Sequence, residues 1–259
     1  MRRPRAIVLR APGTNCDEET CEAWRLAGAD VEAIHIGRLL ETSSLLDGAQ
    51  ILTIPGGFSY GDDLGAGRIM AARLGNVLGD ALRAFHDRGG LVLGICNGFQ
   101  VLVRAGLLPG GDAGSATLAH NDSGRFESRW VRLKVRPGKS PFFDAAGPEI
   151  VELPVAHGEG KFLLASEDDI ARLESAGQVL LQYVNDENVP TQAYPANPNG
   201  SARAIAGVCD PTGRIFGLMP HPERHIDPLQ HPRWTRRLSP LPAAGDGLQI
   251  FTNAVAACR

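Results

Sequence analysis

A cysteine stands between two glycines in the stretch Gly94-Ile95-Cys96-Asn97-Gly98. The apolar residues 91–95 predict a buried strand, and residues 99–105 predict a helix that ends at Gly106. A strand that passes into a helix through a G-x-nucleophile-x-G sequence does so by a tight turn that pushes the central side chain outward. Free N–H groups at the start of the helix stabilise a thiolate. The pattern predicts that Cys96 is a nucleophile; the alternative is a buried thiol that fills a gap in the core.

A cysteine nucleophile needs a base, and the base needs a group that orients it. Two histidines have a glutamate two positions later, His157 with Glu159 and His221 with Glu223. In an extended chain residues i and i+2 project to the same side, so the carboxylate can hold the imidazole in one tautomer. Prolines flank His221, which directly follows the apolar residues 215–219. We therefore predict His221 as the base and Glu223 as its orienting group, and we expect a structural or substrate-contacting role for His157.

Attack on a carbonyl group creates negative charge that backbone N–H groups stabilise. Asn97 supplies one such N–H directly after Cys96. The glycine pair Gly56-Gly57, at the end of the predicted strand 50–54, is the candidate for the second N–H, although glycine pairs in loops are common.

Strands and helices alternate in the first half of the chain, which predicts right-handed crossovers and a parallel sheet. The helix at 18–27 is expected to have Thr14 or Asn15 as its N-cap and to stop at Gly28. The other elements predicted here are strands at 6–9, 31–36, 50–54 and 91–95 and helices at 69–85 and 99–105.

The second half is richer in antiparallel signals. Residues 127–135 alternate apolar and polar side chains, and residues 205–209 and 215–219 flank the turn-forming sequence 210–213, which predicts a hairpin. Residues 225–245, with several prolines, are expected to form an irregular surface excursion. Further strands are predicted at 151–156 and 179–184, and a closing helix at 247–257. We predict one domain over 1–259, of the α/β class: a mostly parallel central sheet flanked by helices, with an antiparallel extension in the second half.

The composition indicates a globular protein rather than a membrane or nucleic-acid-binding one. The chain has 259 residues, of which 43% are hydrophobic, and a formal net charge of -3. It therefore offers no general basic field for nucleic acid, and no apolar run approaches the roughly 18 residues that a membrane span needs. The first apolar stretch, 6–9, is too short for a signal peptide, so we expect a cytoplasmic location.

The five cysteines are spread along the chain without a CxxC pair, which argues against both a disulfide framework and a zinc ribbon. Cys16 is interpreted as a packed thiol near the start of a helix rather than a regulatory one. A metal site built from His221, His225 and His231 was considered, but their spacing matches no strong ligand pattern. We expect no metal in this chain.

Longer blocks of the sequence resemble a known family. The combination of PGG, GICNGFQ and a late HPE is similar to class I (triad-type) glutamine amidotransferases, whose sheet is flavodoxin-like. The blocks PGTNCDEET, IPGGFSYGDD, SGRFESRWV, AHGEGKF, NPNGS, IAGV and GLMPHPER resemble the glutaminase subunits of phosphoribosylformylglycinamidine synthase. This resemblance extends from residue 11 to residue 224, and it implies roles for matching positions. They are Cys96 as nucleophile, His221 as general base and then acid, Glu223 as orienting group, the N–H groups of Gly57 and Asn97 as oxyanion hole, and Gln100 in binding glutamine.

The resemblance also implies the reaction and its partners. Glutamine would be hydrolysed to glutamate, and the ammonia would pass to a separate ATP-dependent synthetase that makes formylglycinamidine ribonucleotide in purine biosynthesis. The resemblance also includes assemblies in which a small accessory subunit joins the synthetase. The chain has no G-x-x-x-x-G-K-[ST] loop, so ATP and Mg²⁺ are expected on the synthetase, and no cofactor is expected here.

Two other functions were weighed. A cysteine member of the α/β-hydrolases would also carry its nucleophile on a tight turn between a strand and a helix. In those enzymes the nucleophile, the acid and the histidine follow one another in that order along the chain, whereas His221 precedes Glu223 here. The non-catalytic alternative is a thiol sensor or scaffold, in which Cys96, His221 and Glu223 keep a structural role and catalyse no reaction.

Overall fold

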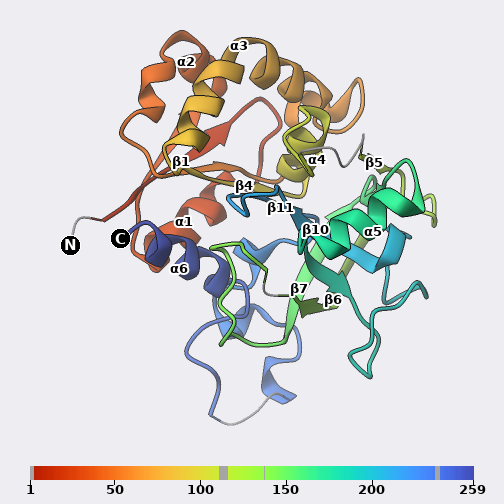
Figure 1. Ribbon diagram of the computed structural model, residues 1–259. Coiled ribbons are helices and arrows are strands. Elements are labelled where there is room, and N and C mark those ends of the chain that lie inside the picture. The colour runs from red at the N-terminus through yellow and green to blue at the C-terminus, as the bar shows by residue number, and fades with distance from the viewer. Residues whose placement is uncertain (1–2, 111–115, 137, 237–239) are drawn as a thin grey trace.

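A nine-stranded mixed sheet forms the centre of the molecule, as Figure 1 shows. The structure is a computed structural model that describes residues 3–110, 116–136, 138–236 and 240–259. The strand order is β2-β1-β3-β4-β11-β10-β9-β6-β7, parallel from β2 to β11 and antiparallel from β11 to β7. The strands are β1 (Arg5–Arg10), β2 (Asp30–His35), β3 (Ile51–Ile54), β4 (Leu91–Ile95), β6 (Glu127–Val135), β7 (Ile150–His157), β9 (Val179–Tyr183), β10 (Ile205–Cys209) and β11 (Ile215–Leu218). The predicted parallel sheet with an antiparallel extension is confirmed.

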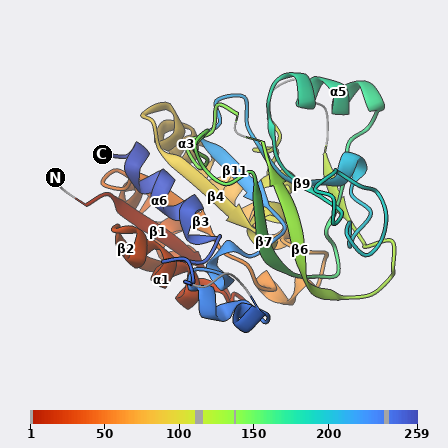
Figure 2. The same ribbon diagram turned by 90° about the horizontal axis from the view of Figure 1, so that it is seen from below.

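Helices cover both faces of the parallel half. In Figure 1, α2, α3 and α4 lie on one face of this half and α1 and α6 lie on the other, and Figure 2 shows α1 and α6 from their own side. The helices are α1 (Asp17–Ala27), α2 (Ile36–Glu41), α3 (Arg68–Asp87), α4 (Asn97–Arg104), α5 (Glu167–Ser175) and α6 (Leu248–Ala257). In the described ranges, no helix is both long and apolar enough to cross a membrane.

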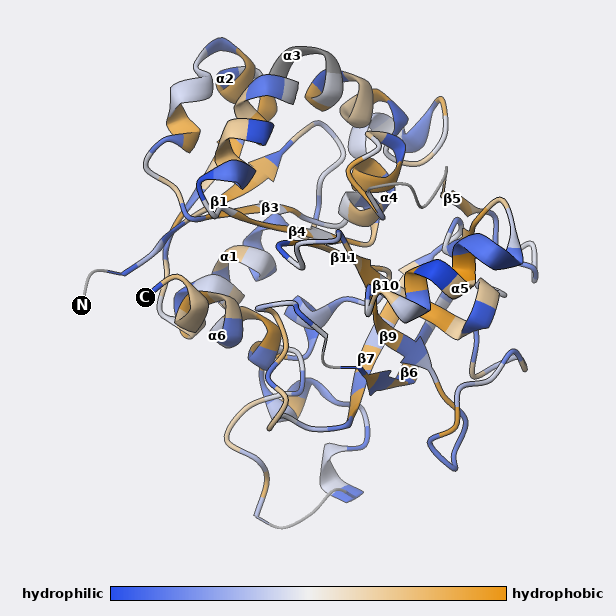
Figure 3. Ribbon diagram, in the orientation of Figure 1, coloured by the Kyte–Doolittle hydropathy of each residue, from blue (hydrophilic) through white to orange (hydrophobic). Residues whose placement is uncertain are grey.

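The core of the parallel half explains why its inner strands β3 and β4 are almost entirely apolar. Every residue of β3 and β4 is buried, because helices lie over both faces, and Figure 3 shows these strands in the colour of hydrophobic residues. Trp24 of α1 packs edge-on against Phe251 of α6, with ring centroids 4.8 Å apart, and its indole N–H donates to the Thr53 hydroxyl at 2.9 Å. These contacts hold the two helices against the sheet. Strand β7 instead alternates between buried and half-buried residues, as a strand with one wet face should.

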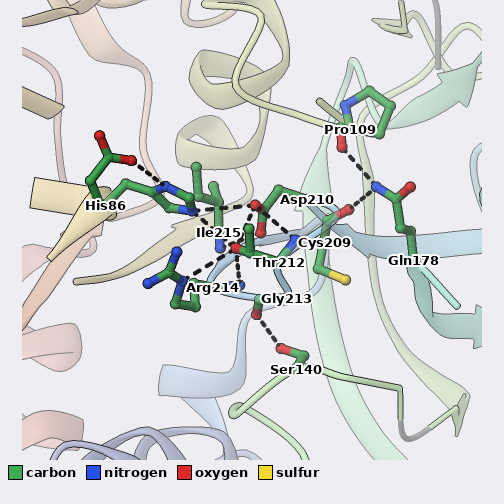
Figure 4. A network of polar contacts seen from close by, with 11 residues as sticks. His86, Pro109, Ser140, Gln178, Cys209, Asp210, Thr212, Gly213, Arg214 and Ile215 are labelled. Atoms are coloured by element: carbon green, nitrogen blue, oxygen red, sulfur yellow. Dashed lines mark hydrogen bonds and ion pairs between the residues drawn. The ribbon is translucent and has the colours of Figure 1, made fainter. Parts of the chain in front are cut away.

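The predicted hairpin of β10 and β11 is confirmed, and its turn is fixed by side chains (Figure 4). The Asp210 carboxylate accepts hydrogen bonds from the Thr212 N–H at 3.1 Å, the Thr212 hydroxyl at 2.6 Å and the Ile215 N–H at 2.8 Å. His86, at the end of α3, contacts the Thr212 hydroxyl at 3.0 Å. The turn is therefore tied to the helix that precedes β4.

Several local expectations were wrong. The N-cap of α1 is Cys16, which makes no side-chain cap hydrogen bond, rather than Thr14 or Asn15. Residue Ile36 starts α2 instead of ending a strand, because the His35 ring accepts a hydrogen bond from the Gly37 N–H and caps a helix there. Helix α5 was not predicted, and neither was a small separate sheet of β5 (Thr117–Ala119) and β8 (Lys161–Leu163).

The segment 225–245 contains only short 3-10 turns in its described part, η5 (Pro228–Gln230) and η6 (Trp234–Arg236); residues 237–239 lie outside the described residues. Its two histidines pack against Trp130 of β6, with ring centroids 4.9 Å away for His225 and 4.5 Å for His231. The His231 ring also contacts the Glu152 carboxylate at 2.8 Å. The excursion is thus anchored on the antiparallel extension of the sheet.

Candidate active site

Three neighbouring strands deliver the candidate residues to one edge of the sheet. Strands β3, β4 and β11 are adjacent and parallel, so their carboxyl ends lie at the same edge, where open α/β sheets bind ligands. Gly57 follows β3, Cys96 follows β4 and His221 follows β11. Residues far apart in the sequence therefore meet because the hairpin of β10 and β11 places β11 beside β4.

The turn at Cys96 is strained, and the glycines around it have no room for a side chain. Cys96 has φ 50° and ψ −103°, a conformation that L residues rarely adopt. A Cβ on Gly94 would lie 2.7 Å from the Gly98 carbonyl oxygen, and one on Gly98 would lie 1.8 Å from the Ile54 carbonyl oxygen. The two glycines thus let α4 start directly against β3, with the thiol at its N-terminus.

His221 and Glu223 form a buried hydrogen-bonded pair. The imidazole Nδ1 lies 2.6 Å from the Glu223 carboxylate, and the two residues are 2% and 0% exposed. The His221 N–H donates to the Pro154 carbonyl at 2.8 Å, which ties the loop after β11 to β7. Burial opposes the charged imidazolium, but the charge of Glu223 and then that of Cys96 raise the pKa of His221 well above its usual value.

Cys96 lies next to this imidazole. The charge of Cys96 acts on the imidazole, and the thiol donates to the Ala156 carbonyl oxygen at 3.7 Å. The His221 Nε2 makes no hydrogen bond of ordinary geometry to the described part of the chain. Because Nδ1 is held by Glu223, Nε2 is the ring atom that can exchange a proton with sulfur or substrate. The structure thus brings Cys96, His221 and Glu223 together in the order that a thiol, a base and an orienting group require.

Replacement of Glu223 by glutamine should lower glutamine hydrolysis by about 10³-fold with little change in KM, because an amide of nearly the same shape cannot stabilise the imidazolium. Steady-state glutamate release measures this. The matched control is Glu152→Gln, since Glu152 forms the other close contact with a histidine, 2.8 Å from His231, far from Cys96. An equal loss in both variants would contradict the role of Glu223.

One candidate oxyanion donor, Gly57, lies on the loop after β3, and the other, Asn97, lies at the start of α4. Gly57 has φ 138°, and a Cβ there would lie 2.8 Å from the Asn15 nitrogen, so only glycine fits. Asn97 begins α4, and its side-chain oxygen accepts a hydrogen bond from the Ser59 N–H at 3.2 Å. This bond holds the loop after β3 against the start of α4.

Gln100 is buried and its amide is occupied by protein groups. Its Nε2 donates to the Glu159 carbonyl at 2.6 Å, and its oxygen accepts from the Asn97 side chain at 3.0 Å. The structure therefore places Gln100 where it supports Asn97 and the loop after β7; a direct contact with glutamine stays a prediction.

His157, at the end of β7, is 2% exposed, and its Nδ1 lies 3.1 Å from the Asn121 side-chain oxygen. Burial, and then the nearby charge of His221, lower the pKa of His157 from 6.5 to about 3. The ring is therefore neutral at neutral pH, which suits a structural or substrate-contacting group rather than a second base.

This pKa predicts a pH dependence of stability. Between pH 6.5 and about 3 the unfolded chain binds a proton at His157 that the folded chain does not, so the free energy of unfolding falls as the pH falls through this range. The contribution is about 1.4 kcal/mol per pH unit. Urea unfolding from pH 7 to pH 4.5 should therefore show a shallower decline in His157→Gln than in the wild type; identical slopes would contradict the burial of a neutral ring.

The structure brings a residue into this cluster that the sequence analysis left outside it. The Cys16 sulfur, an imidazole nitrogen of His221 and a carboxylate oxygen of Glu223 all lie within 4.8 Å of one another. The Arg224 guanidinium donates to this sulfur at 3.0 Å, and a cation in that position disfavours a metal ion beside it. His225 and His231, which were weighed as metal ligands with His221, pack on Trp130 instead. The signal for Cys16 was its position just after β1, which ends at the same edge of the sheet.

Comparisons with known proteins agree with this geometry. Residues 3–258 match the family described as CobB/CobQ-like glutamine amidotransferase domain. The chain is 49% identical over 257 residues to phosphoribosylformylglycinamidine synthase subunit PurQ of Dehalococcoides mccartyi, with 98% of each chain covered. It is 43% identical over 268 residues to the same subunit of Archaeoglobus fulgidus, with 97% of this chain and 96% of that one covered.

Solved structures give the same result. The structure of PurLQS from Thermotoga maritima contains a chain that is 32% identical, with a TM-score of 0.75 and complete coverage of both chains. Another glutamine amidotransferase from Thermotoga maritima, 16% identical, has a TM-score of 0.52 over 91% of this chain and 82% of that one, and supports the fold alone.

Proposed function

The chain belongs to the family of CobB/CobQ-like glutamine amidotransferase domains, and we propose from this membership that it is the glutaminase subunit of a phosphoribosylformylglycinamidine synthase. It hydrolyses the side-chain amide of glutamine and supplies the ammonia to a synthetase. The observation that carries the proposal is the row of thiol, imidazole and carboxylate formed by Cys96, His221 and Glu223 at the carboxyl edge of adjacent parallel strands.

The roles follow from the geometry. The Cys96 thiolate attacks the carboxamide carbon, and the N–H groups of Gly57 and Asn97 stabilise the oxyanion. The His221 imidazolium gives its proton to the departing nitrogen, so ammonia leaves and a γ-glutamyl thioester remains. Neutral His221 then takes a proton from water, the hydroxide attacks the thioester, and glutamate leaves as the thiolate and imidazolium are restored. Glu223 stays charged and holds Nδ1 throughout.

Ammonia is the useful product only if another protein consumes it. In this proposal the acceptor is the ATP-dependent synthetase subunit of the same enzyme, assembled with a small accessory subunit. ATP and Mg²⁺ act on the synthetase, which converts formylglycinamide ribonucleotide to formylglycinamidine ribonucleotide in the cytoplasm. The whole chain, 1–259, acts as one glutaminase domain, and its 225–245 excursion belongs to that domain.

Labelling of the full chain with a glutamine-like chloroketone tests the assignment of the nucleophile. Mass spectrometry should find one label per chain, confined to Cys96, and glutamine should block it. Labelling that spreads over several of the cysteines, or that glutamine does not affect, would favour the thiol sensor or scaffold and remove the proposal.

Delivery of the ammonia is tested with glutamine labelled with ¹⁵N in its amide. In the complex of the chain with the synthetase and accessory subunits, most of the label should enter formylglycinamidine ribonucleotide even when unlabelled ammonium is present. Loss of the label to the bulk ammonium pool would show that the chain is not the donor subunit.

A further inference from the structure

Cys16 lies beside the candidate active site, in a position that contacts with the loop after β3 hold fixed. It caps α1, is 1% exposed, and follows a loop that is bound to the glycine loop after β3. Thr14 forms a β-bridge with Gly57, and the Phe58 N–H donates to the Gly13 carbonyl at 2.9 Å. We propose that Cys16 is a positioning residue: its thiol, held by Arg224, keeps the His221 imidazole in the orientation that faces Cys96. This inference rests on the proposed glutaminase function.

The Cys16 sulfur has defined partners. The Arg224 guanidinium donates to it at 3.0 Å, and the thiol donates to the Asn15 side-chain oxygen at 3.2 Å. Arg224 is itself held by Glu19, with 3.6 Å between the guanidinium and the carboxylate. Desolvation by burial is the main reason why the pKa of the Cys16 thiol lies above its ordinary value. The group is therefore a neutral thiol at neutral pH, which suits a hydrogen-bonding contact and not a nucleophile.

The same sulfur limits the freedom of the His221 ring. The Cys16 sulfur lies within 4.8 Å of an imidazole nitrogen of His221, whose Nδ1 Glu223 holds at 2.6 Å. On the side of Gly56 no space remains, because a Cβ there would lie 2.7 Å from the imidazole Cε1 and 3.1 Å from the Cys16 sulfur. The ring is thus confined by a carboxylate, a thiol and a glycine backbone, and the confined ring interacts with Cys96.

The thiol also lies between two cations. Arg224 and a protonated His221 repel each other, and the neutral Cys16 sulfur accepts a hydrogen bond from the guanidinium while it lies within 4.8 Å of an imidazole nitrogen. The charged and titratable groups that act on the imidazole are Glu223, Cys96, Cys16 and His157, and Arg224 is bonded to the Cys16 sulfur. Loss of the Cys16 contact leaves one side of the imidazole without support, so the ring should face Cys96 in a smaller fraction of the molecules.

The test compares Cys16→Ala and Cys16→Ser with Cys21→Ala, which removes another buried thiol from the same helix. Two quantities are measured on the full chain within its complex: kcat and KM for glutamine, and the rate at which iodoacetamide alkylates Cys96 as a function of pH. We expect Cys16→Ala to lower kcat about tenfold with KM nearly unchanged, and to lower the alkylation rate near neutral pH. Cys16→Ser, whose hydroxyl can replace the hydrogen bonds, should recover most of the kcat, and Cys21→Ala should leave both quantities unchanged.

A second variant keeps the test decisive if Cys16→Ala does not fold. Arg224→Gln removes the charge that holds the sulfur and should move kcat and the alkylation profile in the same direction, by a smaller factor. If the variants that fold match the wild type in both measurements, Cys16 only fills space and the inference is wrong. Failure of the glutaminase proposal looks different, because Cys96 would then not be labelled by the chloroketone even in the wild type.

Discussion

Cys96→Ala should abolish glutamine-dependent synthesis of formylglycinamidine ribonucleotide, with a loss of about 10⁴-fold or more, and leave ammonia-dependent synthesis unchanged. The reason is a division of labour: the thiol forms and breaks the bond to the glutamine carbon, whereas the synthetase uses ammonia from any source. Alanine removes only the sulfur, and the short Cβ stays in the strained turn at φ 50°. The two reactions are measured in the same complex, with glutamine or with ammonium as nitrogen donor.

The matched control for this prediction is Cys258→Ala. This thiol is only partly buried and lies just after α6, away from the strand ends that carry Cys96. The control should retain both reactions. If Cys96→Ala reduced the ammonia-dependent reaction as strongly as the glutamine-dependent one, the residue would be needed for assembly, and the assignment of a nucleophile would fail.

The parts of the site that were predictable from the sequence are those in which local geometry dictates residue type. Glycines on both sides of Cys96 are required because β3 and α4 approach to backbone contact. The residue types in this short stretch therefore predict the turn by themselves. The pairing of His221 with Glu223 was predictable from the spacing, although not through the extended chain that was expected: Glu223 lies in a 3-10 turn, Pro222–Arg224, that begins just after His221. The inner strands β3 and β4 were predictable because burial on both faces makes them short apolar runs, and β7 because its buried and half-buried residues alternate.

The parts that were missed depend on contacts between segments distant in the sequence. Cys16 lies close to His221 because β1 and β11 end at the same edge of the sheet. The residues near Cys16 do not indicate how close those two strands lie in the sheet, so this contact could not be predicted from the sequence. The helix α5 was missed although Ser166 caps it through the Asp169 N–H at 3.2 Å, because its sequence is mostly polar and its hydrophobic stripe is narrow. The contact of Gln100 with glutamine, implied by the resemblance, stays a prediction; its hydrogen bonds to Asn97 and to the Glu159 carbonyl in the loop after β7 could not be predicted from the sequence.

Gly98→Ala should destabilise the protein by about 3 kcal/mol or more, which is larger than the usual effect of a single substitution. Alanine is intrinsically the better helix former, by roughly 1 kcal/mol, so any loss must come from the contact that the new methyl group makes. At Gly98 that contact is backbone: the added Cβ would lie 1.8 Å from the Ile54 carbonyl oxygen and 2.7 Å from its carbon. A backbone carbonyl of a buried central strand cannot rotate away as a flexible side chain can, so α4 must shift and Cys96 must shift with it.

Gly75→Ala is the matched control for this prediction, because Gly75 also lies inside a helix, in α3, and no described atom would lie within 4 Å of its Cβ. There the helix propensity acts alone, and the substitution should raise the free energy of unfolding by roughly 0.5 to 1 kcal/mol. Urea unfolding of both variants, followed by far-UV circular dichroism, measures the two effects with opposite expected signs. Glutaminase activity should fall in Gly98→Ala and stay unchanged in Gly75→Ala. If Gly98→Ala were as stable as the wild type, the close approach of α4 to β3 would not exist, and the thiol would lack the rigid turn that aims it at His221.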